Sequence, residues 1–265
     1  MHEIADIACN FTSDRFDNDL DEVINQAIVN NITKFGLICS RLSDIDKLLE
    51  IYNRYSKDMF FTIGVHPHHA NEINEEYLKK LKEVINNNNP HAIGETGLDF
   101  FRNLSTYEEQ IFAFEEQIKI AIDTNKPLFL HQRDSHDDFI KILRKYSSDI
   151  NKSVVHCFTG TKEQLNDYLE LDCYIGVTGW ICDAKRNVEL RKTIKNIPLE
   201  RLMIETDCPY LIPKNLEEKP KNNRNEPTYL NHIANEVAAL MKEDINDIRE
   251  KTYKTSLHFF KNKKF

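Results

Sequence analysis

The chain has 265 residues, a length that a single hydrophobic core can still fill, so we expect one domain over residues 1–265. Hydrophobic residues make up 40% and charged residues 29% of the chain, which excludes wholesale disorder and a fibrous architecture. The formal net charge of −8 argues against broad electrostatic binding to duplex DNA, because such binding requires many phosphate contacts from lysine and arginine.

The cysteines and the amino terminus indicate the compartment. Six cysteines lie far apart without a Cys-x-x-Cys pair, which is unlike a disulfide framework or a zinc ribbon. Residues 1–10 include Glu3 and Asp6 and lack the basic flank and apolar run of a signal peptide, and no stretch approaches membrane-spanning length. We therefore expect a soluble, cytoplasmic monomer with free thiols and no membrane partner.

Eight short apolar segments, rich in β-branched and aromatic residues, predict strands that are buried on both faces. In chain order these segments are 3–9, 34–40, 60–66, 92–99, 127–133, 153–158, 173–179 and 201–207. Stretches of helical periodicity separate them, as at Leu20, Val23 and Ile24.

Two further helices are predicted after the last strand, around residues 230–240 and over residues 245–260, where they complete the outer layer. Alternation of strand and helix forces a parallel sheet through right-handed crossovers. Eight such units in this length predict a closed (β/α)8 TIM barrel, in preference to an open doubly wound sheet.

Ionisable side chains stand on or at the end of five predicted strands. They are His66, Glu95, His131, His156 and Asp207. A single residue of this kind is equally well explained by a hydrogen bond to the next loop. Five of them at the carboxyl rim of one barrel, where the active sites of this fold lie, indicate a functional site.

Imidazole and carboxylate ligands together suit a divalent cation, with Mg²⁺, Mn²⁺ and Zn²⁺ as the candidates. Such a cation would polarise a phosphoryl oxygen and lower the pKa of bound water, and Asp207 is the candidate general base. The sequence contains no glycine-rich phosphate loop and no nucleophile elbow. Cys157 follows His156 directly, so we expect its thiol to point to the opposite face and pack outward against helices.

Six sequence blocks resemble the signature blocks of the TatD family of metal-dependent DNases, in matching order and spacing. They are Gly64-Val65-His66-Pro67-His68, Ile93-Gly94-Glu95-Thr96-Gly97-Leu98-Asp99-Phe100, His131-Gln132-Arg133-Asp134, His156-Cys157-Phe158-Thr159-Gly160, Gly176-Val177-Thr178-Gly179-Trp180 and Glu205-Thr206-Asp207-Cys208-Pro209-Tyr210. The resemblance implies a TIM barrel, Mg²⁺ as the usual cofactor, and 3′-to-5′ exonuclease activity on single-stranded DNA, with RNA as a further candidate substrate.

The resemblance also implies roles for individual residues. Glu95, His131 and His156 would bind the metal, Asp207 would contact both metal and water, and His66 would face the substrate phosphate. One departure concerns the first strand, which reads Asp6-Ile7-Ala8-Cys9-Asn10 where most relatives carry a His-x-His pair for a second metal. Because alanine offers no ligand atom, we expect that second site to be weak, vacant or filled only with substrate phosphate present.

Substrate contacts are expected from His66, His68, Arg133, Trp180 and Arg224. A guanidinium can hold a phosphate in bidentate fashion, although a lone loop arginine is more often solvated. Aromatic residues also follow strand ends, where unpaired bases could stack, and Trp180 is the best candidate among them. These residues are Phe100, Phe101, Phe158, Trp180 and Tyr210.

Two carboxylates near the metal blocks, Asp99 and Glu205, could either orient the ligands or bind the rim by hydrogen bonds, and the sequence favours neither role. Two rival functions remain open as well. An amidohydrolase that cuts C–N bonds would usually keep the first-strand histidine pair and often a bridging lysine, and neither is evident. A non-catalytic nucleic-acid binder would have no need of Glu95, His131, His156 and Asp207.

Overall fold

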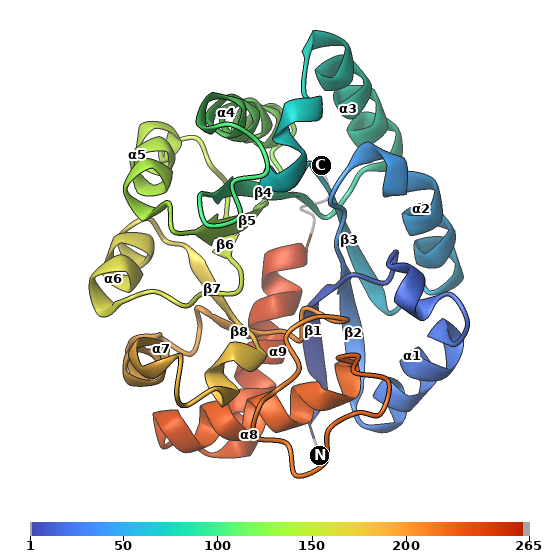
Figure 1. The fold of residues 1–265 in the computed structure, drawn as a ribbon, viewed down its shortest axis with the longest axis vertical. Coiled ribbons are helices and arrows are strands. Elements are labelled where there is room, and N and C mark those ends of the chain that lie inside the picture. The colour runs from blue at the N-terminus through green and yellow to red at the C-terminus, as the bar shows by residue number, and fades with distance from the viewer. Residues whose placement is uncertain (1, 262–265) are drawn as a thin grey trace.

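In the computed structural model, which describes residues 2–261, eight parallel strands form a barrel whose order in space follows the sequence (Figure 1). The strands are β1 (Ile4–Cys9), β2 (Ile32–Leu37), β3 (Met59–Ile63), β4 (Ala92–Asp99), β5 (Leu128–Arg133), β6 (Ser153–Val155), β7 (Tyr174–Val177) and β8 (Leu202–Ile204). Parallel pairing between Cys9 and Cys208 joins the two ends of the sheet, with the Asn10 amide donating to the Cys208 carbonyl at 2.8 Å. The predicted closed barrel is therefore confirmed.

Helices surround the barrel as an outer ring (Figure 1). They are α1 (Leu20–Val29), α2 (Ile45–Arg54), α3 (Glu75–Asn88), α4 (Tyr107–Asp123), α5 (His136–Tyr146), α6 (Lys162–Glu170), α7 (Val188–Thr193), α8 (Leu230–Met241) and α9 (Ile245–Phe260). Two of them begin with capping boxes, in which Thr106 and Thr161 exchange hydrogen bonds with Glu109 and Gln164. None of the helices within residues 2–261 is long and apolar enough to span a membrane.

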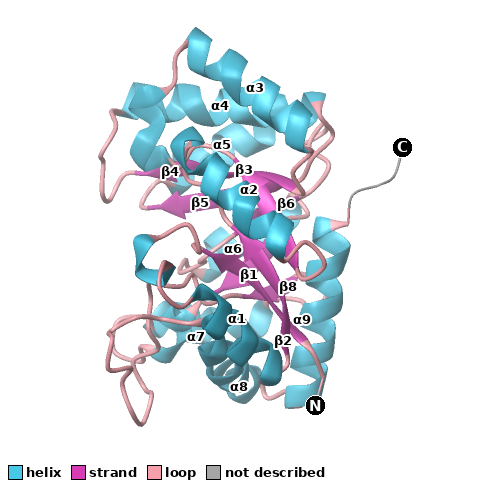
Figure 2. Cartoon of the chain, turned by 90° about the vertical axis from the view of Figure 1, so that its right-hand side faces the viewer, coloured by secondary structure: helices cyan, strands magenta, loops and turns pink. Residues whose placement is uncertain are grey.

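We expected the last helix only to complete the outer layer, but in the structure it also packs against the interior of the barrel. The rings of Phe259 and Phe260 belong to the same apolar cluster as Phe129, whose neighbours Leu128 and Leu130 face the outer helices. Because side chains alternate along a strand, Phe129 points into the barrel. Figure 2 shows α9 lying across the end of the barrel where the strands begin, and the rings at its carboxyl end pack against Phe60 and Tyr174 at the starts of two strands.

Five strands are shorter than predicted at their carboxyl ends, namely β2, β3, β6, β7 and β8, and three of these shortenings concern site residues. β3 ends at Ile63, β6 at Val155 and β8 at Ile204, so His66, His156 and Asp207 stand one to three residues beyond the strands. Glu95 and His131 lie within β4 and β5. The predicted domain over residues 1–265 extends at both ends beyond the described residues.

The pairing of β4 with β5 is unusually close, because two glycines of β4 have no side chain. A Cβ on Gly97 would lie 1.9 Å from the His131 carbonyl oxygen, and its φ of +144° is one that glycine adopts freely. A Cβ on Gly94 would lie 2.3 Å from the Phe129 carbonyl oxygen. These contacts bring Glu95 beside His131.

Candidate active site

A cavity of about 1600 Å³ opens at the carboxyl end of the barrel. Its walls are formed by residues from the ends of the strands and from the loops that follow them, which is where active sites of this fold lie. The five ionisable residues predicted from the sequence all line it. They are His66, Glu95, His131, His156 and Asp207.

Glu95 is at the centre of this group. Its Oε1 atom lies 2.7 Å from His156 Nε2, 2.9 Å from His131 Nδ1 and 3.3 Å from His66 Nε2. Only 6% of the Glu95 residue is exposed, so this carboxylate interacts with imidazoles in place of water. Three histidines from three different strand ends thus converge on one carboxylate oxygen.

The electrostatics of the group follow from this convergence. Burial alone would raise the pKa of Glu95, but the imidazoles of His156, His66 and His131 hold that pKa well below its usual range. Burial would likewise lower the pKa of His156, yet Glu95 and Glu205 together raise it well above its usual range. The cluster therefore favours positive charge next to Glu95.

The same residues offer ligand atoms for a metal ion. His66, Glu95 and His131 each present one ligand atom, and these atoms lie within 4.8 Å of one another. His156 contributes a further nitrogen at 2.7 Å from Glu95. A set of imidazole nitrogens around a carboxylate oxygen, in surroundings that favour positive charge, fits a divalent cation.

Two buried carboxylates stand behind the histidines. Asp99 Oδ2 lies 3.4 Å from His131 Nε2, and Glu205 Oε1 lies 3.5 Å from His156 Nδ1. Each of these imidazoles therefore presents one nitrogen to Glu95 and the other to a second carboxylate, the arrangement that orients metal-binding histidines. Glu205 is completely buried, and Gly176 makes room for it, since a Cβ there would lie 2.9 Å from Glu205 Oε1.

Asp99 also binds the rim. Its Oδ2 accepts from His68 Nε2 at 2.7 Å, and its Oδ1 accepts from the backbone amide of Arg102 at 2.7 Å. Asp99 therefore contacts both the rim and His131, which are the partners that its two predicted roles require. Through Asp99, the predicted substrate residue His68 is connected to His131.

Asp207 lines the cavity beside the cluster and is held from the first strand. Its Oδ1 accepts a hydrogen bond from the side-chain amide of Asn10 at 2.9 Å. Burial raises the pKa of Asp207 to about 7, with further contributions from the negative charges of Glu95 and Glu205. A carboxylate with this pKa can accept and release a proton near neutral pH, as a general base must.

Asp6 is a residue that sequence reasoning overlooked. It is completely buried in β1, and its carboxylate accepts from the Thr206 backbone amide at 2.9 Å and from the Thr206 hydroxyl at 2.5 Å. Asp6 thereby fixes the segment that carries Asp207. An aspartate within a strand predicted to be buried on both faces was the available signal, because buried carboxylates need partners.

Arg224 requires a correction. We expected its guanidinium to contact substrate phosphate, but it does not line the cavity, and only 6% of the residue is exposed. Its Nη1 and Nη2 donate to the two carboxylate oxygens of Asp19 at 2.8 and 2.7 Å, and Nη2 also donates to Glu226 at 2.8 Å. Because two carboxylates already neutralise the charge, Arg224 supports the loop structure instead.

Cys157 requires a second correction. We expected its thiol to pack outward, but Cys157 lines the cavity, with its Sγ 3.6 Å from the Thr178 hydroxyl. Its φ of +49° interrupts the alternation of a regular strand, which was the basis of the prediction. Burial raises the pKa of the thiol to about 12, so it stays protonated at neutral pH.

The other predicted substrate residues, His68, Arg133 and Trp180, do line the cavity. Among the aromatic residues, Phe158 is buried outside it, whereas Phe101 and Tyr210 line it and are 56% and 54% exposed. Trp180 is only partly exposed and packs against the core. The aromatic surface open to a ligand therefore lies mainly at residues other than Trp180.

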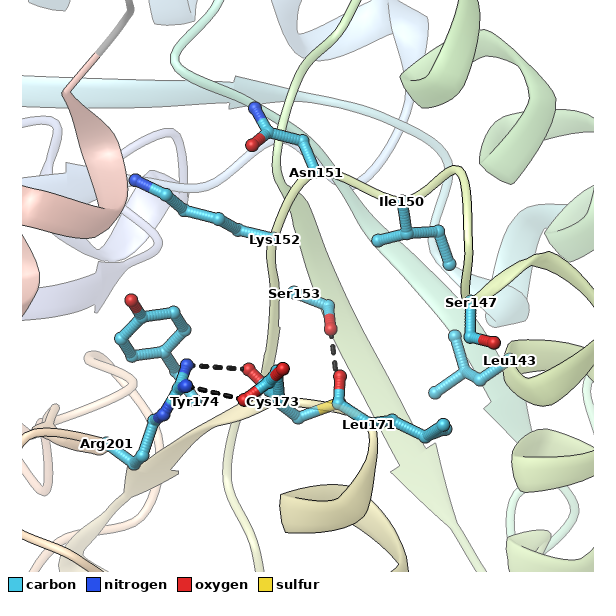
Figure 3. A pocket seen from close by; sticks show the side chains of 11 residues that line it. Leu143, Ser147, Ile150, Asn151, Lys152, Ser153, Leu171, Cys173, Tyr174 and Arg201 are labelled. Carbon is cyan, nitrogen blue, oxygen red and sulfur yellow. Dashed lines mark hydrogen bonds and ion pairs between the residues drawn. The ribbon is translucent and has the colours of Figure 1, made fainter.

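A cavity of about 320 Å³ lies at the opposite end of the barrel, where β6, β7 and β8 begin (Figure 3). The Ser153 hydroxyl lies 3.1 Å from Cys173 Sγ in it, and Arg201 pairs with Asp172 at 2.6 Å. Among residues 2–261, no histidine lines this cavity, and the one lining carboxylate, that of Asp172, is paired with Arg201. It therefore lacks the acid–base groups of the larger cavity.

A (β/α)8 barrel with a buried carboxylate–imidazole cluster at its carboxyl rim defines the class of metal-dependent hydrolases. The family model described as TatD related DNase matches residues 5–261, so the chain belongs to this family.

The relatives agree with this assignment. The chain is 39% identical over 258 residues to the 3′-5′ ssDNA/RNA exonuclease TatD of Edwardsiella piscicida, covering 97% of this chain and 99% of the relative. It is 41% identical over 239 residues to the protein of the same name from Erwinia billingiae (strain Eb661), covering 90% and 92%. A crystal structure of a hydrolase TatD family protein from Entamoeba histolytica superposes with a TM-score of 0.88 at 31% identity, covering 97% and 98%.

Proposed function

We propose that this chain is a divalent-metal-dependent 3′-to-5′ exonuclease that hydrolyses single-stranded DNA, with RNA as a further substrate. The observation that carries the proposal is the convergence of His66, His131 and His156 on Glu95 at the carboxyl rim of the barrel. Relatives that share about two fifths of the sequence carry the name of this activity.

Glu95, His131 and His156 would hold the cation, with His66 and Asp207 beside them. When bound, the cation supplies positive charge that polarises a phosphoryl oxygen and lowers the pKa of water. Mg²⁺ is our first candidate from the family. Mn²⁺ and Zn²⁺ belong in the same test, because imidazole nitrogens favour the later transition metals.

The remaining steps belong to the side chains. Asp207 would accept the proton of the attacking water, for which its pKa of about 7 is suited. Burial lowers the pKa of His66 to about 4, so this imidazole is neutral at pH 7 and can donate one N–H to a phosphate oxygen. Asp99 and Glu205 would keep His131 and His156 in their orientations.

An end-labelling assay tests the proposal. Single-stranded DNA labelled at its 3′ or 5′ end is incubated with the wild type, with Glu95→Ala, and with Glu83→Ala as a control on the exposed face of α3. We expect rapid release of the 3′ label as a mononucleotide, gradual shortening of the 5′-labelled strand, and loss of both with chelator or with Glu95→Ala. Cleavage that survives chelation, or that Glu95→Ala leaves intact, would contradict the mechanism.

A further inference from the structure

Exposed apolar surface is concentrated at one part of the cavity wall. Phe101 and Leu104, in the loop that follows β4, are 56% and 62% exposed, and both line the cavity. Large apolar side chains left this open to water, and grouped at the mouth of a cavity, mark a binding surface. Asp99 holds the start of this loop, because its Oδ1 accepts a hydrogen bond from the backbone amide of Arg102 at 2.7 Å.

The same cavity is lined by two guanidinium groups, those of Arg102 and Arg133, that have no carboxylate partner within residues 2–261. Arg133 lies over the ring of Phe101, with its Cζ 3.9 Å from the ring centroid, and Arg102 is the next residue along the loop. Within residues 2–261, neither guanidinium forms an ion pair or a side-chain hydrogen bond.

The other cationic side chains that line the cavity differ in this respect. Arg41 pairs with Asp44, Lys47 with Asp17, and Arg186 with Asp183. Their charges are largely compensated by these carboxylates. Arg102 and Arg133 are therefore the cations of this wall that are free to bind an anion.

The combination suits a nucleotide in particular. A flat aromatic face binds a base by stacking, and every base offers such a face. An unpaired guanidinium binds a phosphate in bidentate fashion. Because Arg133 covers one face of Phe101, the other, exposed face is left for the base.

We propose that Phe101, Arg102, Leu104 and Arg133 form a subsite for one of the two nucleotides that flank the scissile phosphate. The base stacks on Phe101 and Leu104, and the guanidinium groups hold the phosphate of that nucleotide. This proposal rests on the nuclease activity proposed above and deepens it.

The position of the subsite relative to the catalytic cluster supports this assignment. Asp99 connects the two directly, because its Oδ1 holds the Arg102 amide while its Oδ2 lies 3.4 Å from His131 Nε2. Arg133 follows His131 on β5 by two residues, so both point to the same side of the strand. A nucleotide bound here therefore lies next to a phosphate at the Glu95 cluster.

The subsite also explains a preference for single strands. A base can stack on Phe101 only when it is unpaired and has left the stack of its neighbours. A paired end must first open, which costs free energy. The net charge of −8 is no obstacle, because two local guanidinium contacts require no broad basic surface.

Equilibrium binding tests the subsite without requiring turnover. The probe is a fluorescent single-stranded hexanucleotide with hydrolysis-resistant phosphorothioate linkages, measured with Mg²⁺ present. Phe101→Ala is compared with Phe112→Ala, which removes a phenyl ring that is 46% exposed on α4 and does not line the cavity. We expect Phe101→Ala to weaken binding by about 5- to 100-fold, Phe112→Ala to bind like the wild type, and Phe101→Trp to retain affinity.

Abasic probes identify the partner of Phe101. The base is removed at the 3′-terminal or at the penultimate nucleotide. For the wild type, we expect one of these two probes to lose as much affinity as Phe101→Ala does. With that probe, Phe101→Ala should cause no further loss, because base and ring belong to one contact. The subsite would be overturned if the affinity losses from Phe101→Ala and from the abasic probe multiplied when the two were combined. Equal affinity of Phe101→Ala and Phe112→Ala for the intact probe would overturn it as well.

The salt dependence of binding tests the guanidinium groups. Arg133→Gln should reduce the slope of log Kd against log salt concentration by about 0.7, the value for one phosphate contact on a single strand. An unchanged slope would overturn the assignment of Arg133. If the chain binds the probe through Phe101 but fails to cut DNA in the end-labelling assay, the proposed nuclease activity is wrong, and Phe101 is a nucleotide-binding residue without a role beside a scissile phosphate.

Discussion

Replacing Glu205 by glutamine removes one negative charge behind the metal cluster with almost no change in shape. Glu205 Oε1 accepts the Cys157 backbone amide at 2.6 Å, and a glutamine oxygen can keep this bond. What is lost is the charge that faces His156 Nδ1 at 3.5 Å and raises the pKa of that imidazole. Carboxylates behind metal-binding histidines typically contribute 10- to 100-fold to metal affinity, or about 1.4 to 2.7 kcal/mol.

We therefore expect Glu205→Gln to bind Mn²⁺ about 10- to 100-fold more weakly than the wild type, measured by calorimetric titration at pH 7. Glu236→Gln is the matched control, since Glu236 pairs with Arg191 on the outside of the barrel and does not line the cavity. Thermal unfolding in chelator shows whether each variant is folded. A folded Glu205→Gln protein with wild-type affinity for Mn²⁺ would refute the orienting role of Glu205.

Two further predictions concern metal number and pH. Calorimetric titration of the wild type with Mn²⁺ or Zn²⁺ should show one tight site without DNA, because Ala8 offers no ligand atom and the Asn10 side-chain amide donates to Asp207, and two equally tight sites would contradict this. His91 Nδ1 accepts the Phe61 backbone amide at 3.2 Å, and burial lowers the pKa of His91 to about 4, from 6.5 in the unfolded chain. The unfolded chain therefore binds more protons between these values, so the stabilisation present above pH 6.5 is lost as the pH falls towards 4, by about 2 kcal/mol at pH 5. Urea unfolding at pH 8 and pH 5 should show a loss that is about 2 kcal/mol larger in the wild type than in His91→Gln; equal losses in both would show that His91 is not responsible.

The barrel could be predicted from sequence because its signal is periodic and local. Eight apolar segments separated by helical patterns leave few alternatives, and the helix predicted over residues 245–260 has those bounds in the structure. The role of α9 could not be predicted. Nothing local distinguishes a helix of the outer ring from one whose Phe259 and Phe260 close the end of the barrel.

The centre of the site could be predicted because its residue types are rare at the ends of buried strands. Glu95, His131 and His156 meet in the cavity as their positions in the chain indicate. The surrounding contacts join residues about 200 positions apart, such as Arg224 with Asp19 and Asp6 with Thr206. No local sequence pattern indicates contacts between residues so far apart. The burial of Arg224 and the function of Asp6 could therefore be recognised only in the folded structure.

The first strand supports the site although it contains no histidine. The side-chain amide of Asn10 donates a hydrogen bond to Asp207 Oδ1 at 2.9 Å. The carboxylate of Asp6 accepts a hydrogen bond from the backbone amide of Thr206, the residue that precedes Asp207. Both contacts act on the segment after β8, and they add to two backbone hydrogen bonds that join this segment to the first strand, from Asp207 N to Ala8 O and from Asn10 N to Cys208 O. Since β1 and β8 are neighbours only because the barrel closes, β1 supports the proposed general base even where it contributes no metal ligand. The absence of a histidine pair from the first strand is therefore compatible with the proposed hydrolysis, provided that the Asp6 and Asn10 contacts are kept.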